Sequence, residues 1–236
     1  MTISDWNTIP QDSPFSGEET LSVLAAAERY AEQNRKSLAI QVGKLLEKGK
    51  ENEAADMICF RFGNTGKWRS SDVLRCFYER FKDPYILYRC IISVYVDDGY
   101  NFPKRIMLKA KKIAPSIPEV ERFGDLPDGD KITVYRATAA PADKARNELS
   151  WTTNRTVAIW FGYRLSTPLH IYTGTIKRGK IIAYMNERKE YEVIQHGSVK
   201  DITEIHPTNE DIQQALKWHT ESTIKHNQEL LAGPPP

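Results

Sequence analysis

The sequence changes character once, at a segment rich in proline and glycine between residues 115 and 130. Three prolines and two glycines fall there: Pro115, Pro118, Gly124, Pro127 and Gly129. Before this segment, apolar residues recur at three- and four-residue steps, a spacing typical of amphipathic helices. After it, the apolar runs are short and rich in β-branched and aromatic residues, which is typical of strands bounded by turns. We therefore predict an α+β chain with a helical N-terminal half and a C-terminal half that contains the strands.

The N-terminal half is predicted to comprise a flexible leader over residues 1–16 and a helical region over residues 17–120. Helical spacing marks four stretches of this region: residues 18–34, 37–49, 51–60 and 105–114. Two further helices are expected to begin at capping residues. Ser71 and Asp72 are the candidate caps of one helix, and Asp83, which is followed by proline, is the candidate cap of the other.

The C-terminal half is predicted to form a domain over residues 121–230, followed by a loose tail over residues 231–236. Five runs have the length and alternation of strands: residues 132–136, 169–176, 180–185, 191–195 and 199–205. A helix over residues 154–164 is expected between the first two strands. Thr208 and Asp211 have the spacing of a capping box and are expected to open the last helix.

Composition excludes several classes of protein. With 40% apolar and 27% charged residues, the chain has the makeup of a folded globular protein. Its formal net charge of +2 gives no support for binding nucleic acid or membranes through bulk charge. The longest apolar-rich run, residues 85–96, is too short to span a bilayer, and residues 1–19 lack the pattern of a signal peptide. The three cysteines have no spacing typical of a disulfide framework or a zinc site. We expect a cytoplasmic protein that uses no metal.

Three separated segments of the C-terminal half fit one active site. The first is an apolar strand that ends in Arg136, and the second is Ser150-Trp-Thr-Thr, which precedes the helix over residues 154–164. The third is Glu190-Tyr-Glu192 at the start of an apolar run. Because side chains alternate between the faces of a strand, this spacing predicts that Glu190 and Glu192 share one face.

Together and in this order, the three segments resemble the mono-ADP-ribosyltransferase superfamily, in particular the phage and bacterial members of the branch named for an Arg–Ser–Glu triad. The resemblance extends over residues 130–205, and the apolar helix with Ala158, Trp160 and Phe161 and the turn before Glu190 also match the family. It implies an ADP-ribosyltransferase-like fold, a split β-sandwich of two small sheets with flanking helices.

The resemblance also implies a reaction and a role for each residue. The substrate is NAD+, whose bond between nicotinamide and ribose breaks while the ribose becomes cation-like, as in glycoside cleavage. Glu192 is the carboxylate beside that cation. Arg136 binds the diphosphate, because a guanidinium pairs with phosphate oxygens in a forked geometry. The other NAD-binding residues that the resemblance implies are Ala137 through its backbone, Ser150, Thr152 and Phe161.

The acceptor is predicted from Glu190 and from the turn before it. In relatives that modify arginine, the first glutamate of Glu-x-Glu contacts the acceptor guanidinium, so Glu190 favours a target protein with an acceptor arginine. Tyr184 and Arg188 are the predicted substrate-recognition residues, and Arg188 near a phosphate keeps a nucleic-acid acceptor open. Two more functions stay open: an NAD glycohydrolase, in which water replaces the acceptor, and a non-catalytic interaction protein on the same fold.

Overall fold

The structure is a computed structural model, and it describes residues 17–62, 69–98, 102–164, 169–186 and 189–232. The predicted leader over residues 1–16 lies outside these residues. The chain divides into two compact units, Met1–Met107 and Leu108–Pro236. The division falls within helix α5 (Lys104–Ile113).

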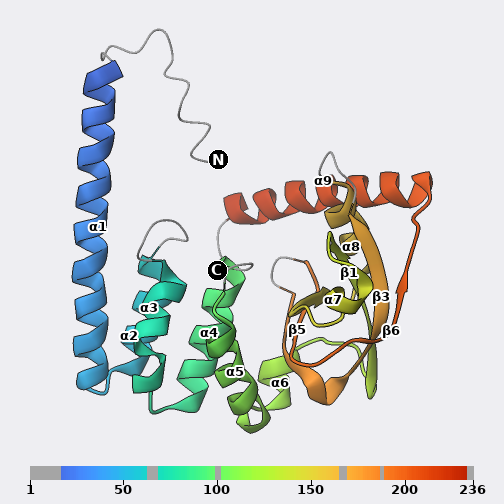
Figure 1. Ribbon diagram of the computed structural model, residues 1–236, viewed down its shortest axis with the longest axis horizontal. Coiled ribbons are helices and arrows are strands. Elements are labelled where there is room, and N and C mark those ends of the chain that lie inside the picture. Colours follow the sequence, from blue (N-terminus) through green and yellow to red (C-terminus); the bar gives the residue numbers. More distant parts are fainter. Residues whose placement is uncertain (1–16, 63–68, 99–101, 165–168, 187–188, 233–236) are drawn as a thin grey trace. The chain divides into compact units, whose positions relative to one another are not determined.

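The first unit is helical throughout its described residues (Figure 1). Its elements are α1 (Gly17–Glu47), α2 (Glu51–Arg61), α3 (Ser70–Phe77), the 3-10 helix η2 (Tyr78–Arg80) and α4 (Pro84–Asp98), followed by the first residues of α5. The two helices predicted over residues 18–34 and 37–49 are one continuous helix, α1. No glycine or proline separates them, so nothing interrupts the backbone hydrogen bonds there.

Two predicted helix starts in this unit have different outcomes. The Asp83 cap is confirmed, because its Oδ1 accepts hydrogen bonds from the backbone N–H of Tyr85 (2.8 Å) and Ile86 (3.2 Å). The Ser71 cap is wrong. Ser71 lies inside α3, and its backbone N–H donates to Oδ2 of Asp98, a residue at the end of α4 (3.1 Å).

The second unit combines the strands with helices. After α5 come η4 (Ala114–Ser116), α6 (Glu119–Phe123), β1 (Lys131–Thr138), α7 (Ala142–Ala145), β2 (Ser150–Thr152), α8 (Arg155–Tyr163), β3 (His170–Lys177), η5 (Arg178–Lys180), β4 (Ile181–Met185), β5 (Glu192–Gln195), β6 (Lys200–Glu204) and α9 (Asn209–Ala232). The five predicted strands are confirmed, with no end displaced by more than two residues. The capping box is also confirmed, because Thr208 and Asp211 exchange hydrogen bonds at the start of α9.

The strands form one antiparallel sheet with the order β4-β5-β2-β1-β3-β6. This mixture of helices and an antiparallel sheet confirms the α+β class. The sheet is uneven, since β1 and β3 pair along eight positions whereas β1 and β2 pair only at Tyr135 and Thr152. The single residue pair between β1 and β2 therefore joins two three-stranded halves of the sheet, β4-β5-β2 and β1-β3-β6.

Each side of the sheet packs against helices. On one side, Val134, Trp151 and Val193 share a core with Phe123 of α6 and Ala145 of α7. The other side contains a smaller core of Ala158, Ile159, Ile171 and Ala215, in which α8 and α9 meet the sheet (Figure 1). Within the described residues, no helix combines the length and the apolar character needed to cross a bilayer.

Candidate functional site

The three predicted segments lie on three neighbouring strands, although 56 residues separate the first from the last along the chain. Arg136 is on β1, Ser150 and Thr152 are on β2, and Glu192 begins β5. The sheet order places β2 between the other two. Thr152 is the central position, because it pairs with Tyr135 of β1 on one side and with Glu192 of β5 on the other.

The register decides which side chains share a face. Directly opposite residues of antiparallel strands project to the same face, and so do residues two positions apart. Ser150, Thr152 and Glu192 therefore project from one face of β2 and β5. Tyr135, opposite Thr152, packs in the core that contains α8, so this is the side of the sheet on which α8 lies.

The register does not place the Arg136 side chain on the face that carries Glu192. Along β1 it alternates with Tyr135, so it does not start from the face that carries Thr152. Continued pairing would place Ser150 opposite Ala137, but the strands pair only at Tyr135 and Thr152 and therefore diverge beyond that point. There the Arg136 guanidinium extends from β1 to β2, and its Nη1 donates to the backbone carbonyl of Ser150.

The other contacts of Arg136 identify a site residue that the sequence did not indicate. Its Nη2 lies 3.4 Å from Oε2 of Glu148, in the connection between α7 and β2. Its Nε is buried without a hydrogen-bond partner among the described residues. Native structures rarely leave such a donor unpaired, and bound water or a ligand is the usual explanation. The side chain keeps 17% of its surface exposed.

Hydrogen bonds to the backbone of Glu148 and Leu149 hold the segment before β2 in place. The Glu148 carbonyl accepts hydrogen bonds from Nε1 of Trp151 (3.1 Å) and from Nε2 of Gln195 (2.7 Å). The backbone N–H of Gln195 donates to the Leu149 carbonyl (2.8 Å). The carboxylate that faces Arg136 is thus positioned by β2 and β5 together.

The prediction that Glu190 and Glu192 share one strand face is wrong. β5 begins at Glu192, and Tyr191 before it has a φ of 52°, in the left-handed region that non-glycine residues seldom adopt. Lys189 has a similar φ of 56°. The Glu190 carbonyl accepts a hydrogen bond from Oγ1 of Thr152 (2.7 Å), which ties this turn to the centre of the site. Strained backbone of this kind is concentrated at functional sites.

Two of the predicted NAD-binding residues, Phe161 on α8 and Ala137 on β1, lie on the side of the sheet that carries Glu192. Asn154 caps α8 by accepting from the backbone N–H groups of Thr156 and Val157, so only two residues separate the end of β2 from the start of the helix. Phe161 is partly exposed on this helix, with the Arg164 guanidinium 4.5 Å from its ring centre. Ala137, on β1, packs in the core that α8 contributes to.

Of the two predicted substrate-recognition residues, the structure describes Tyr184, and it does not lie on that face. Tyr184 pairs with Val193 and lies in the opposite core, with only 9% of its surface exposed. Burial raises the pKa of its hydroxyl, and a hydrogen bond with the Thr153 side chain opposes the shift. Arg188 lies outside the described residues.

The described residues contain no group of three or more His, Cys, Asp and Glu side chains arranged to hold a metal ion. The available chemistry is that of a carboxylate, a guanidinium and hydroxyl groups on adjacent strands. Comparisons of the chain with protein-family models, with curated proteins and with solved structures gave no match.

Proposed function

We propose that the chain is an NAD-dependent mono-ADP-ribosyltransferase that modifies arginine side chains of a target protein. The observation that carries the proposal is the position of Thr152, which pairs with the strand of Arg136 on one side and with Glu192 on the other. Residues 136, 150 and 192, chosen from sequence for their chemistry, thus fall on adjacent strands. A non-catalytic interaction protein on the same fold would share the strand order but would not need the Arg, Ser and Glu side chains at these positions.

The proposal includes the finer architecture of the second unit, a split β-sandwich of two small sheets. The divergence of β1 from β2 beyond Tyr135 supports it, because the sheet is continuous there only through one residue pair. A ligand that inserts between two half-sheets meets polar groups from both, and here those groups are Arg136 from one half and Ser150 from the other.

The proposed chemistry assigns each residue one task. NAD+ loses nicotinamide as a neutral base, and positive charge develops on the ribose. The Glu192 carboxylate stabilises that charge, and fixed charges of this kind supply a large part of enzymatic rate enhancement. Arg136 binds the diphosphate through its guanidinium, exchanging its 3.4 Å contact with Glu148 for phosphate oxygens. Phe161 on α8 offers an aromatic surface on the same side of the sheet.

Glu190 is the proposed contact for the acceptor. It lies outside the regular strand, on the turn that the left-handed Tyr191 and the Thr152 hydrogen bond hold in place. A carboxylate placed there can orient an incoming arginine and accept its proton, which matters because a free guanidinium is protonated and a poor nucleophile.

The test of this function uses NAD+ labelled in its adenylate phosphate. We expect nicotinamide release together with labelled protein when wild-type protein is incubated with a cell lysate, and mass spectrometry should locate ADP-ribose on arginine. Release of free ADP-ribose with no labelled protein would identify a glycohydrolase, and label on nucleic acid would change the acceptor. Absence of both nicotinamide release and NAD+ binding at millimolar concentration would contradict the proposal.

The Glu190→Gln variant separates acceptor use from NAD+ cleavage. We expect transfer to protein to fall by about tenfold or more, since the carboxylate that accepts the proton is gone, while nicotinamide release stays near the wild-type rate. The matched control is Glu204→Gln, which alters an exposed carboxylate on the outer strand β6 that contacts His170. Equal losses of release and transfer in Glu190→Gln would contradict the assigned role.

A further inference from the structure

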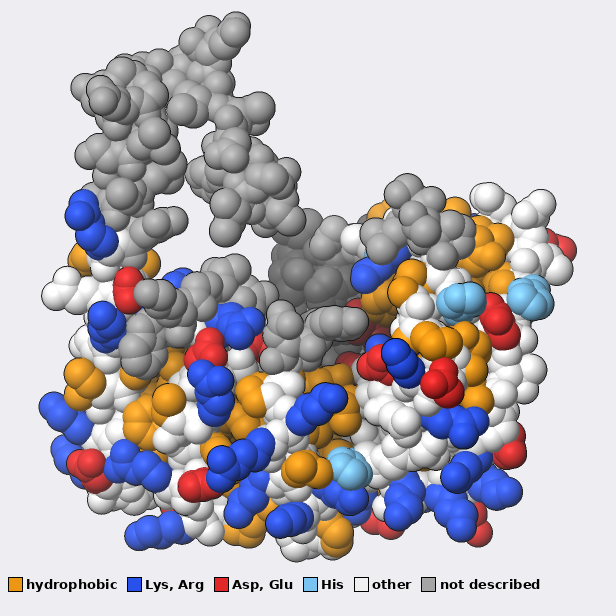
Figure 2. Space-filling model, in the orientation of Figure 1, with side chains coloured by type: hydrophobic (Ala, Val, Ile, Leu, Met, Phe, Trp, Pro, Cys, Tyr) orange, Lys and Arg blue, Asp and Glu red, His pale blue; other side chains and the backbone are white. Residues whose placement is uncertain are grey.

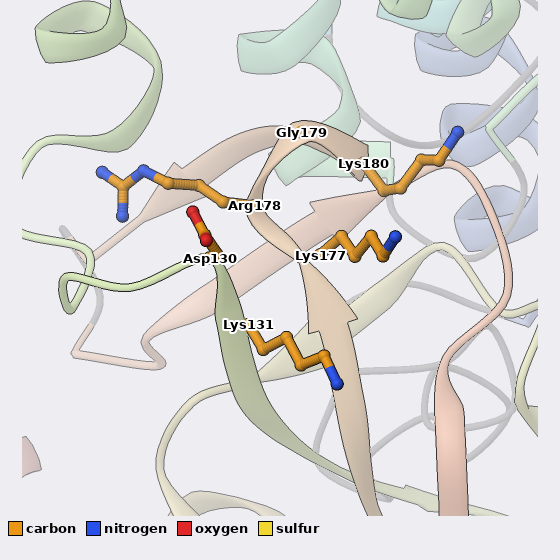
Figure 3. A pocket seen from close by; sticks show the side chains of 6 residues that line it. All are labelled: Asp130, Lys131, Lys177, Arg178, Gly179 and Lys180. Atoms are coloured by element: carbon orange, nitrogen blue, oxygen red, sulfur yellow. The ribbon is translucent and has the colours of Figure 1, made fainter.

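A separate cavity lies at the end of β1 that is remote from Arg136. It has a volume of about 520 Å³ and is lined by Asp130, Lys131, Lys177, Arg178, Gly179 and Lys180 (Figure 3). Lys131 is the first residue of β1, five positions before Arg136. At the usual rise of a strand, about 17 Å separate the two backbone positions, so the cavity is distinct from the proposed NAD+ site.

Two lysines of this cavity face each other across the sheet. Lys131 and Lys177 are a directly opposite pair of the β1–β3 ladder. Like charges in such pairs destabilise a sheet, because the side chains project to the same face only a few ångströms apart. Both are exposed, and neither ammonium group forms an ion pair or hydrogen bond with any residue that the structure describes. Solvent screens part of their repulsion, and no described carboxylate forms an ion pair with either ammonium group.

Lys180 adds a third positive charge from the turn that follows β3. Figure 3 shows the three lysine side chains extending to one side of this turn and Arg178 extending to the other, toward Asp130. The Lys180 carbonyl accepts a hydrogen bond from the backbone N–H of His196 (3.1 Å), but its ammonium group has no ion-pair or hydrogen-bond partner in the described parts of the chain. A Cβ atom added at Gly179 would meet nothing within 4 Å, so the surface between Lys177 and Lys180 is open.

Arg178 fixes the turn that carries two of these lysines. Its Nη1 donates to the Pro127 carbonyl (2.9 Å), and its guanidinium lies 4.6 Å from the ring centre of Phe123. Its backbone N–H donates to the Asp130 carbonyl (2.9 Å). These contacts hold η5 against the core of the unit, so the spacing of the lysines on either side of Gly179 is set by the fold.

We propose that this lysine cluster, Lys131, Lys177 and Lys180, binds a ligand that carries two or more phosphate groups. Each ammonium group offers three donors and a full charge, and a chain of phosphates can contact all three lysines while cancelling the repulsion between two of them. Figure 2 shows Lys and Arg side chains, with some Asp and Glu among them, gathered at the lower right. The proposal does not depend on NAD+ chemistry.

The test compares two probes and two matched variants by calorimetry at low salt. The probes are inorganic tripolyphosphate and a short oligothymidylate, which present free and backbone phosphates respectively. The variant K131Q/K177Q/K180Q removes the cluster. The control K109Q/K111Q/K112Q removes the same net charge from exposed lysines of α5. We expect the first variant to weaken binding by about tenfold or more and the control to change it less than about twofold.

Each outcome has a defined meaning. Binding of either probe that the cluster variant loses supports the site, and the probe that binds identifies the source of the phosphates. The melting temperature of each variant shows whether it is folded, and Lys180→Gln, which lies outside the strands, provides a second variant that leaves the β1–β3 pair intact. The proposal is overturned if neither probe binds the wild type, or if both triple variants lose binding equally.

An independent observation in the first unit concerns its cysteines. Cys59 on α2 and Cys90 on α4 are joined by a hydrogen bond between their Sγ atoms at 3.8 Å. This bond lowers the pKa of the Cys59 thiol, whereas the same bond and burial raise the pKa of Cys90. Cys76 is a third free thiol and is exposed. Redox-sensitive cysteines characteristically pair a thiol of low pKa with a second thiol in contact.

We further propose that a hydroperoxide converts Cys59 and Cys90 into a disulfide. The Cys59 thiolate attacks the terminal oxygen of the hydroperoxide, an S–O bond forms and the O–O bond breaks. The other oxygen takes up a proton and leaves as an alcohol or water, and Cys59 becomes a sulfenic acid. The Cys90 sulfur then attacks the Cys59 sulfur, and water leaves with the Cys90 proton. Overall, two thiols are oxidised by two electrons and one hydroperoxide is reduced.

Peptide mass spectrometry after peroxide treatment and alkylation tests this step. We expect a linked peptide pair that is two hydrogens lighter than the two thiols, while Cys76 stays available to the alkylating reagent at low peroxide. Cys76→Ser should still form the link, and Cys90→Ser should leave a Cys59 sulfenic acid that dimedone traps. Oxidation of Cys76 ahead of Cys59, or alkylation of both Cys59 and Cys90 after full peroxide treatment, would overturn the proposal.

Discussion

Glu192→Gln is expected to abolish measurable ADP-ribose transfer while leaving the protein folded. The amide keeps the shape of the side chain at the start of β5 but removes its negative charge. That charge is assigned to the ribose cation, which exists only as nicotinamide departs. We therefore expect the rate of nicotinamide release to fall by about a hundredfold or more, with little change in NAD+ affinity.

Two measurements make this result specific. Nicotinamide release gives the rate of bond cleavage, and calorimetry gives the NAD+ affinity, which should stay near wild type because Arg136 still binds the diphosphate. Glu204→Gln serves again as the matched control and should leave both quantities unchanged. Release by Glu192→Gln at the wild-type rate would remove Glu192 from the mechanism, and loss of NAD+ binding alone would reassign it to substrate binding.

Local chemistry accounts for the elements that sequence predicts well. Asp83 and Thr208 cap helices through hydrogen bonds with residues two to three positions away, so the neighbouring sequence is enough to predict them. The start of β1 shows the alternation expected of a strand, because Ile132 and Val134 are buried whereas Lys131 and Thr133 are exposed. The order of the Arg, Ser and Glu segments indicated a common site, and the sheet brings their strands together.

Contacts between distant segments account for what the sequence did not reveal. The backbone N–H of Ser71 donates to the carboxylate of Asp98, 27 positions away along the chain. Arg136 contacts Glu148, and hydrogen bonds from β2 and β5 to the Glu148 carbonyl hold that residue in position. The separation of Glu190 from Glu192 depends on the left-handed backbone of Tyr191. The alternation of polar and apolar residues cannot predict such a turn, because tyrosine is a common residue in strands and rarely adopts a positive φ.

Trp151→Ala is expected to produce the largest loss of stability in the second unit. Trp151 is 2% exposed and lies between Ser150 and Thr152, with its ring in the core that also contains Val134, Val193 and Phe123. Truncating a buried tryptophan to alanine removes its apolar contacts and leaves a cavity, at a cost of about 3–5 kcal/mol. We expect the melting temperature to fall by about 10 °C or more.

The conservative variant Trp151→Phe separates the two contributions of the side chain. Phenylalanine retains most of the buried ring but cannot donate the 3.1 Å hydrogen bond from Nε1 to the Glu148 carbonyl, so a loss of about 1–2 kcal/mol is expected in chemical denaturation. Because that carbonyl belongs to the residue whose carboxylate faces Arg136, NAD+ binding by Trp151→Phe should weaken even under conditions where the variant is fully folded. If Trp151→Ala proves as stable as the wild type, the core on the α6 and α7 side of the sheet is not packed around Trp151, and the placement of Ser150 and Thr152 beside Glu192 fails with it.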